Sequence, residues 1–136
     1  MSLMDVAAWL AVVDAQVAAR ASSADRAWAW CWAIRTLAQR DLQAAPPGTT
    51  TDAVWVAPQM AWAMDDLADA GAHTHPPDLP DVPDAGIRSL IAPALRRLLD
   101  ATAVDDPRMP AGLVEACGYA ARRAAIAHHA YAGTLP

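Results

Sequence analysis

The sequence contains no lysine, no phenylalanine and no asparagine, and it has a single glutamate. Because lysine is absent, all ten basic residues are arginines, and they stand against fifteen acidic residues. The net charge is −5 and the isoelectric point is about 5.1. A protein that binds nucleic acid normally carries a basic face that displaces counterions from the phosphates. We therefore expect no nucleic-acid partner.

Long apolar runs and secretion signals are also missing. The longest uncharged apolar stretch, residues 53–64, is about twelve residues long, whereas a membrane-spanning helix needs about 20. Asp5 and Asp14 interrupt the amino terminus, where a signal peptide would be positively charged and then apolar. Cys31 and Cys117 lie in apolar patterns without a CxxC motif, which is typical of buried reduced thiols. We expect a soluble cytoplasmic protein with no membrane contact.

Residues that favour strands are scarce, whereas alanine is abundant. Hydrophobic residues make up 55% of the chain, and 35 alanines account for nearly half of them. Alanine is the best helix former, and strands prefer β-branched and aromatic residues. A chain of 136 residues is long enough to bury one core. The composition predicts an all-α protein in which residues 1–136 form a single domain, an antiparallel bundle of four or five helices.

Periodicity and punctuation place five helices along the chain. We expect them at about 3–20, from Ser22 or Ser23 to about 43, from about 52 to 70, from 84 to about 99, and after Pro110 to about 132. Gly71 should end the third helix, and residues 72–83 form an irregular connection rich in proline and acid. Pro58 and Pro93 fall inside helical patterns, where each either kinks a helix or starts one. At Pro58 we favour a kinked helix.

Tryptophan is the main large aromatic residue, with six copies. Residues 27–34 read AWAWCWAI, which is apolar on every helix face, so this turn must be surrounded by the chain itself or by a partner. Three interpretations stay open: core packing, an interface, or a pocket for a small apolar or anionic ligand. The candidate ligand or interface residues are Trp28, Trp30, Trp32, Arg35, Trp55 and Trp62.

An acidic segment with histidines follows Trp62. If the third helix continues, the spacing of Asp66, Asp69 and His73 puts them on one face, and such a set suits Mg²⁺, Mn²⁺ or Zn²⁺. Asp65 beside them is a candidate general base. The alternative is a solvated helix end, because Gly71 would stop the helix before His73 faces Asp69.

Asp65, Asp66 and Asp69 also spell D-D-x-x-D. This pattern resembles the motif by which isoprenoid synthases hold Mg²⁺ and a substrate diphosphate. The resemblance covers five residues, no second acidic motif follows, and the chain is less than half as long as those enzymes, so we do not assign the family. The chain is similar in size to all-helical nucleotide pyrophosphatases, but these use E-x-x-E and E-x-x-D spacings, and its single glutamate is Glu115.

Taken together, these patterns favour a helical binding or interaction module over an enzyme. We expect it to form a homo-oligomer through the apolar turn of the second helix, or to bind another protein there. A first alternative is a divalent-metal-dependent hydrolase of a phosphorylated or diphosphate substrate, with Asp66, Asp69 and His73 as ligands. A second is small-molecule binding in a pocket lined by tryptophan. No G-x-S-x-G motif supports nucleophilic catalysis.

Overall fold

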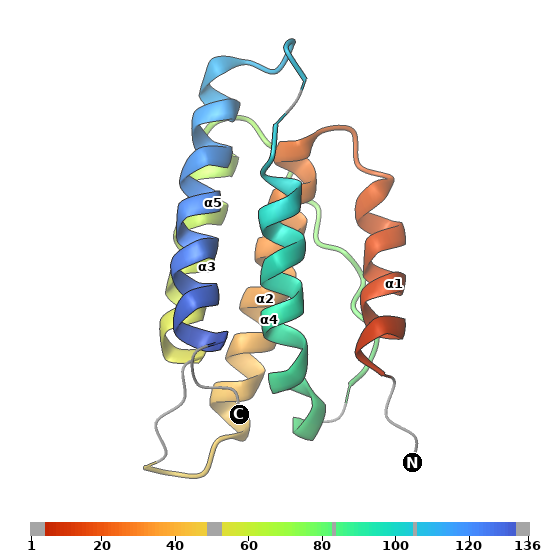
Figure 1. The fold of residues 1–136 in the computed structure, drawn as a ribbon, viewed down its shortest axis with the longest axis vertical. Helices are drawn as coiled ribbons and strands as arrows, with labels where there is room; N and C mark the ends of the chain where they lie inside the picture. Colours follow the sequence, from red (N-terminus) through yellow and green to blue (C-terminus); the bar gives the residue numbers. More distant parts are fainter. Residues whose placement is uncertain (1–4, 49–52, 83, 105, 133–136) are drawn as a thin grey trace.

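The computed structural model describes residues 5–48, 53–82, 84–104 and 106–132, and this part of the chain is helical with no strand (Figure 1). The helices are α1 (Val6–Ala18), α2 (Ser23–Ala44), α3 (Ala53–Asp69), α4 (Asp84–Ala101) and α5 (Ala111–Ala132). The all-α prediction is confirmed, and the expected helix ends agree with the observed ones to within a few residues. No helix in the described ranges has the length and apolar character needed to cross a membrane.

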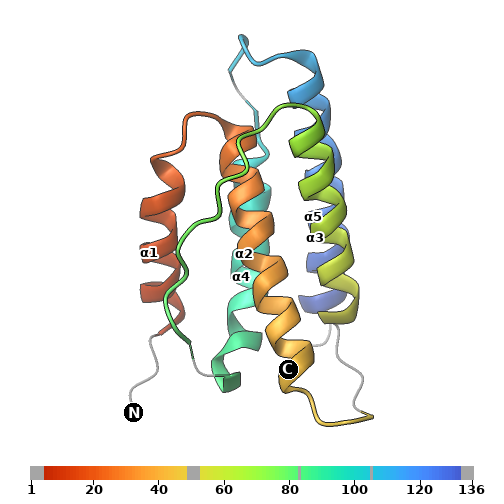
Figure 2. The same ribbon diagram turned by 180° about the vertical axis from the view of Figure 1, so that it is seen from behind.

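Helices α2 to α5 form an antiparallel bundle of two layers, and α1 lies outside it. Helices α2 and α4 form one layer and α3 and α5 the other, whereas α1 packs against α2 and α4 on the side away from α3 and α5 (Figure 1). Each bundle helix runs antiparallel to its adjacent neighbours, whereas α2 and α5 lie diagonally across the bundle and run in the same direction (Figure 1). Helices α3 and α4 run in the same direction, so the chain between them must return along the length of the bundle (Figure 2). This is a bundle with one long crossover connection.

Helix α2 lies at the centre of the fold. The Ser22 side chain caps it by accepting a hydrogen bond of 3.1 Å from the Asp25 amide. Its apolar turn is buried by α1, α3, α4 and α5, so that Trp28 is 6% exposed, Trp30 is 2% exposed and Ile34 is fully buried. The expectation that two copies join through this turn must therefore be corrected. The chain's own helices already cover most of it, and only Trp32 in this stretch is half-buried.

Helices α4 and α5 bury side chains of different size. On α5 the buried face consists mainly of small residues, including Cys117, Ala120, Ala124 and Ala127, and Tyr131 closes its end. On α4 the leucine and isoleucine side chains from Ile87 to Leu98 are buried. Small residues on one helix leave space for large ones on another, which lets the two layers interdigitate.

Gly71 ends α3 through a Schellman motif. The Ala72 amide donates to the Leu67 carbonyl at 2.9 Å, and the Gly71 amide donates to the Ala68 carbonyl at 3.0 Å. Gly71 has a φ of 108°, a backbone conformation that is strained for residues with a side chain and is readily adopted by glycine. The predicted stop is confirmed. Helices α3 and α4 continue through their internal prolines, Pro58 and Pro93, so neither proline starts a helix. The expected start of the third helix at about residue 52 lies outside the described residues.

The crossover connection, residues 72–82, has no regular secondary structure and runs along α2 and α1 (Figure 2). Its peptide groups cannot pair within a helix or sheet, so other partners must satisfy them. Side chains of α1, α2 and the turn between them provide five such partners: Trp9, Gln16, Arg20, Asp25 and Arg40. The connection is therefore an ordered part of the fold.

Helix α1 contacts the connection at Asp78 and Pro80. The Gln16 side chain bonds to Asp78 in both directions: its Nε2 donates to the Asp78 carbonyl at 2.6 Å, and its Oε1 accepts from the Asp78 amide at 2.7 Å. The Trp9 indole donates to the Pro80 carbonyl at 3.3 Å and is itself fully buried. Sequence patterns did not single out Trp9, although it is one of the largest side chains in the core.

Helix α2 contacts the connection at its first residues, through His73, and at its last, through Val82. Asp25 Oδ1 accepts a hydrogen bond of 2.8 Å from the His73 amide, and an Arg40 terminal nitrogen donates to the Val82 carbonyl at 2.9 Å. Asp25 is only 4% exposed. A buried carboxylate is costly unless it is hydrogen-bonded, so this contact explains an acidic residue inside the fold.

Replacing Asp25 with alanine should destabilise the protein. Asp25→Ala leaves the His73 amide without its acceptor, and we expect the free energy of unfolding to fall by about 1–3 kcal/mol. Urea unfolding followed by circular dichroism measures this loss. The matched control is Asp65→Ala on the exposed surface of α3, which should change stability by less than about 0.5 kcal/mol. Equal stabilities of the two variants would contradict the role given to Asp25.

Candidate functional site

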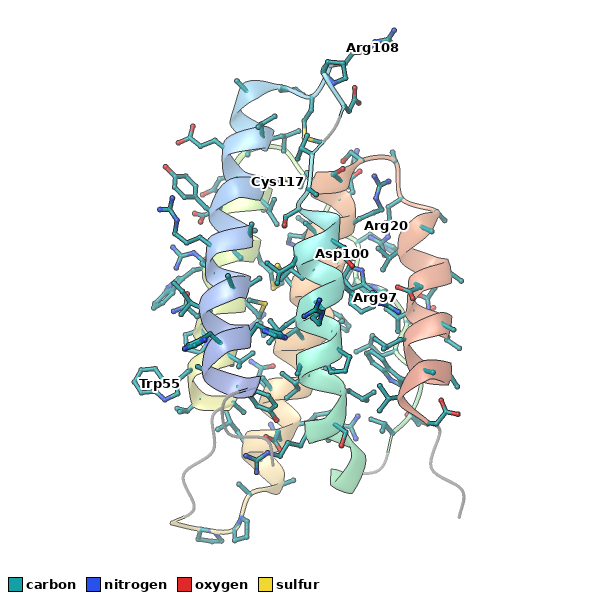
Figure 3. All side chains as sticks on the ribbon, viewed as in Figure 1. Arg20, Trp55, Arg97, Asp100, Arg108 and Cys117 are labelled. Carbon is teal, nitrogen blue, oxygen red and sulfur yellow. The ribbon has the colours of Figure 1, made fainter. Side chains whose placement is uncertain are left out.

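The structure separates the candidate tryptophans into two groups. Trp28 and Trp30 belong to the core, whereas Trp55 and Trp62 on α3 are 64% and 50% exposed. Figure 3 shows Trp55 pointing away from the bundle. Trp32 and Arg35, the other two candidates, are half-buried on α2. The two groups of indole rings therefore do not enclose a shared pocket, which was one of the three interpretations that the sequence left open.

Trp55 and Trp62 instead belong to an exposed surface that spans α3 and α5, here called the α3–α5 face. Its apolar part consists of these two side chains together with Tyr119, which is 44% exposed, and Ile126, which is 54% exposed. Within each pair the spacing is seven residues, which places both members on the same side of their helix. The two helices pack on each other. The face lies on the side of the bundle opposite α1.

Arg123 from α5 organises the centre of the α3–α5 face. Its guanidinium carbon lies 5.2 Å from the centre of the Trp62 ring, in the range of a cation–π contact. A terminal nitrogen of Arg123 donates to Gln59 at 3.3 Å, and its Nε lies 3.7 Å from Asp66 Oδ2. The last distance is too long for a hydrogen bond, and this buried Nε has no hydrogen-bond partner among the described residues. Arg123 therefore joins α5 to three residues of α3.

One end of the α3–α5 face is acidic. An open cavity of about 240 Å³ lies there, between the last turns of α3 and the first turns of α5, and it is lined in part by Asp66, Asp69 and Glu115. The Tyr119 hydroxyl donates to Glu115 at 2.8 Å. This hydrogen bond, followed by the charge of Glu115, raises the pKa of Tyr119 above its ordinary value. The volume is below the 300–1,000 Å³ typical of ligand pockets.

The predicted metal ligands do not come together. Helix α3 ends before His73, whose amide is bonded to Asp25, so the three residues of the predicted set cannot share a helix face. Asp66 pairs with Arg123, and Asp65 and Asp69 are exposed. In the parts of the chain that the structure describes, no three His, Cys, Asp or Glu side chains are placed to hold a metal ion. The hydrolase hypothesis therefore lacks the ligand set on which it was built.

The cysteines are buried and are poor nucleophiles. Cys31 and Cys117 are both fully buried and unbridged. Burial raises the pKa of Cys31 far above its usual range, and the nearby Cys117 raises it further. Burial also raises the pKa of Cys117. Because the thiolate is the reactive form, these environments favour an inert structural role for both thiols.

We expect both thiols to resist alkylation in the folded protein. With iodoacetamide at about pH 8, near the pKa of a free thiol, the raised pKa values and burial should slow labelling by at least about tenfold relative to the unfolded chain. Mass spectrometry with and without guanidinium chloride measures the difference. Rapid labelling of Cys31 or Cys117 without denaturant would show that the thiol is accessible and ionised.

The function of this protein has to be inferred from its own sequence and structure. The exposed tryptophans, the acidic end of the α3–α5 face and the remaining cavities are the features available for that inference. No protein-family model matches the chain, and no curated protein or solved structure matches it either.

Proposed function

We propose that this protein is a self-associating interaction module and that two copies join through the α3–α5 face. The observation that carries the proposal is the exposure of Trp55 and Trp62, at 64% and 50%, on one side of α3. Tryptophan is enriched at the centres of protein interfaces, where it often supplies much of the binding energy. Tyr119 and Ile126 on the adjacent helix extend the apolar area.

The size of the apolar area supports a stable contact. A fully buried aromatic side chain covers about 150–250 Å², so half-exposed side chains still offer roughly 100 Å² each. The four apolar residues of the face thus offer roughly 400 Å². A standard interface buries about 800 Å² per partner. These side chains would supply about half of that area, and the polar residues around them would supply the rim.

The charges on the face favour an antiparallel arrangement of the two copies. The acidic end consists of Asp65, Asp66, Asp69 and Glu115. Arg122 and Arg123 lie near the middle of α5. A twofold axis parallel to the helices would bring the two acidic ends together, which costs energy. A twofold axis across the helices separates the two acidic ends and brings each of them toward the arginines of the other copy, so we propose this arrangement.

Removing one exposed tryptophan should weaken the dimer. We expect Trp55→Ala to raise the dimer dissociation constant by about 30-fold, the effect of losing an anchor worth about 2 kcal/mol. Sedimentation velocity over a concentration series measures it. The matched control is Val12→Ala, an exposed apolar residue on α1 at the other side of the bundle, which should leave the constant unchanged.

Two outcomes would contradict this proposal. A wild-type protein that stays monomeric across the micromolar range would overturn self-association. A wild-type dimer that Trp55→Ala leaves intact would show that the α3–α5 face is not the interface. In the second case the protein would still be a homo-oligomer, but its contact would lie elsewhere.

Salt should weaken the dimer if the antiparallel arrangement is correct. Exposed opposite charges attract less strongly as ionic strength rises, because the screening length falls from about 10 Å at 0.1 M to about 3 Å at 1 M. We therefore expect the dissociation constant to rise as sodium chloride is added over this range, while helicity measured by circular dichroism stays constant. A dimer that tightens with salt would contradict the proposed pairing of charges.

A further inference from the structure

A larger cavity, also open to solvent, lies on the other side of the bundle, between α1, α2 and α4. Its volume is about 390 Å³, which falls within the 300–1,000 Å³ range of small-molecule sites. Figure 3 shows Arg97 and Asp100 on the side of α4 that faces α1. The cavity is lined by residues of three helices: Asp14, Val17, Ala18, Arg26, Trp30, Arg97, Asp100 and Ala101.

The wall of the cavity is partly apolar. Trp30 is 2% exposed and Val17 3%, so only a small part of each reaches the wall, and Ala18 and Ala101 supply the rest of its apolar surface. An indole ring and small aliphatic side chains form a surface that suits the apolar group of a ligand. Ala18 and Ala101 are small, so they leave the space open.

Both arginines of the cavity are held in position by the protein. The Nε of Arg97 lies 3.2 and 3.1 Å from the two carboxylate oxygens of Asp14, so this pair uses neither terminal nitrogen of Arg97. The terminal nitrogens of Arg26 donate to the Arg20 carbonyl at 2.9 Å and to Ser23 Oγ at 3.3 Å. A guanidinium has five N–H donors, and each of these arginines retains donors beyond the bonds just described. Fixed guanidinium groups bind carboxylates well.

Two acidic residues balance the two arginines. Asp14 is paired with Arg97, and Asp100 is exposed at the edge of the cavity. A ligand with a net negative charge, such as a phosphate, would be repelled by the two carboxylates. A ligand with a net positive charge would be repelled by the two guanidiniums. A ligand that carries one charge of each sign meets neither penalty.

We propose that this cavity binds a small zwitterion with an apolar group, that is, a free amino acid with an apolar or aromatic side chain. Arg26 and Arg97 hold its carboxylate, Asp100 holds its ammonium group, and its side chain lies against Trp30 and the neighbouring aliphatic residues. This site is independent of the α3–α5 face, which lies on the opposite side of the bundle.

The first experiment uses L-phenylalanine as the probe and the full chain labelled with ¹⁵N. Titration followed by heteronuclear NMR should give saturable shifts at the amides of Ala18 and Ala101 and at the Trp30 indole. Three analogues each lack one part of the probe: 3-phenylpropionate has no ammonium group, phenethylamine has no carboxylate, and glycine has no apolar side chain. Each should bind more weakly than phenylalanine, by at least about threefold, because each loses one contact.

A substitution at Asp100 tests the assigned charge contact. Asp100→Asn should weaken phenylalanine binding by about three- to fivefold, the effect of an ion pair at an exposed position, and should leave 3-phenylpropionate binding unweakened. Asp81→Asn in the exposed crossover connection is the matched control and should leave both affinities unchanged. Melting temperatures of both variants show whether the fold is retained.

Three results would overturn the inference. These are the absence of saturable shifts with phenylalanine, shifts confined to residues outside the cavity, and equal weakening of phenylalanine and 3-phenylpropionate by Asp100→Asn. The last result would show that Asp100 does not contact the ammonium group. None of these measurements depends on dimerisation, so the proposed function and this inference fail or succeed separately.

Discussion

Residues 27–34 of α2 present apolar side chains in every direction, so each side of this stretch must be covered by another part of the chain. Helices α3 and α4 cover two sides and α5 contributes from across the bundle. The remaining side, which carries Trp30, is left to α1. A four-helix bundle alone would leave that side open to water, which explains why a fifth helix packs on the outside of the α2–α4 layer.

The crossover connection follows from the same arrangement. Because α3 and α4 run in the same direction, the chain must travel the length of the bundle between them without forming another helix. Its peptide groups then need partners, and the side chains of α1 and α2 provide them. Helix α1 thus has two roles, since it covers α2 and also bonds to the connection through Trp9 and Gln16.

Local features of this fold could be predicted from the sequence, whereas contacts between distant residues could not. The Ser22 cap and the Gly71 stop each depend on a few consecutive residues, and both were predicted. By contrast, Asp25 contacts a residue 48 positions away and Arg97 one 83 positions away. Their spacing along the chain carries no sign of either contact.

The candidate site shows the same division. A spacing of seven correctly places Trp55 and Trp62 on one side of α3, but it does not reveal whether that side faces the core or water. Buried positions such as Met60 and Leu67 have the same spacing from each other. For the acidic segment, the predicted metal site required α3 to continue as far as His73. The helix instead ends before His73, at the turn in which Gly71 has a positive φ. The sequence identified the residues of interest but left their surroundings open.

The contact between Arg123 and Trp62 has a consequence for how the α3–α5 face would bind. A large exposed side chain normally samples several rotamers in the free protein, and fixing one of them on binding costs about 0.5–1.5 kcal/mol. The Trp62 ring already lies against the guanidinium of Arg123 from α5, and Gln59 and Asp66, which lie on α3 like Trp62, contact the same guanidinium. Part of that ordering is therefore complete before any partner arrives, whereas Trp55, the more exposed ring, has yet to be ordered. The two tryptophans would then play different parts in an encounter, with Trp62 as the preformed contact and Trp55 as the one that adapts.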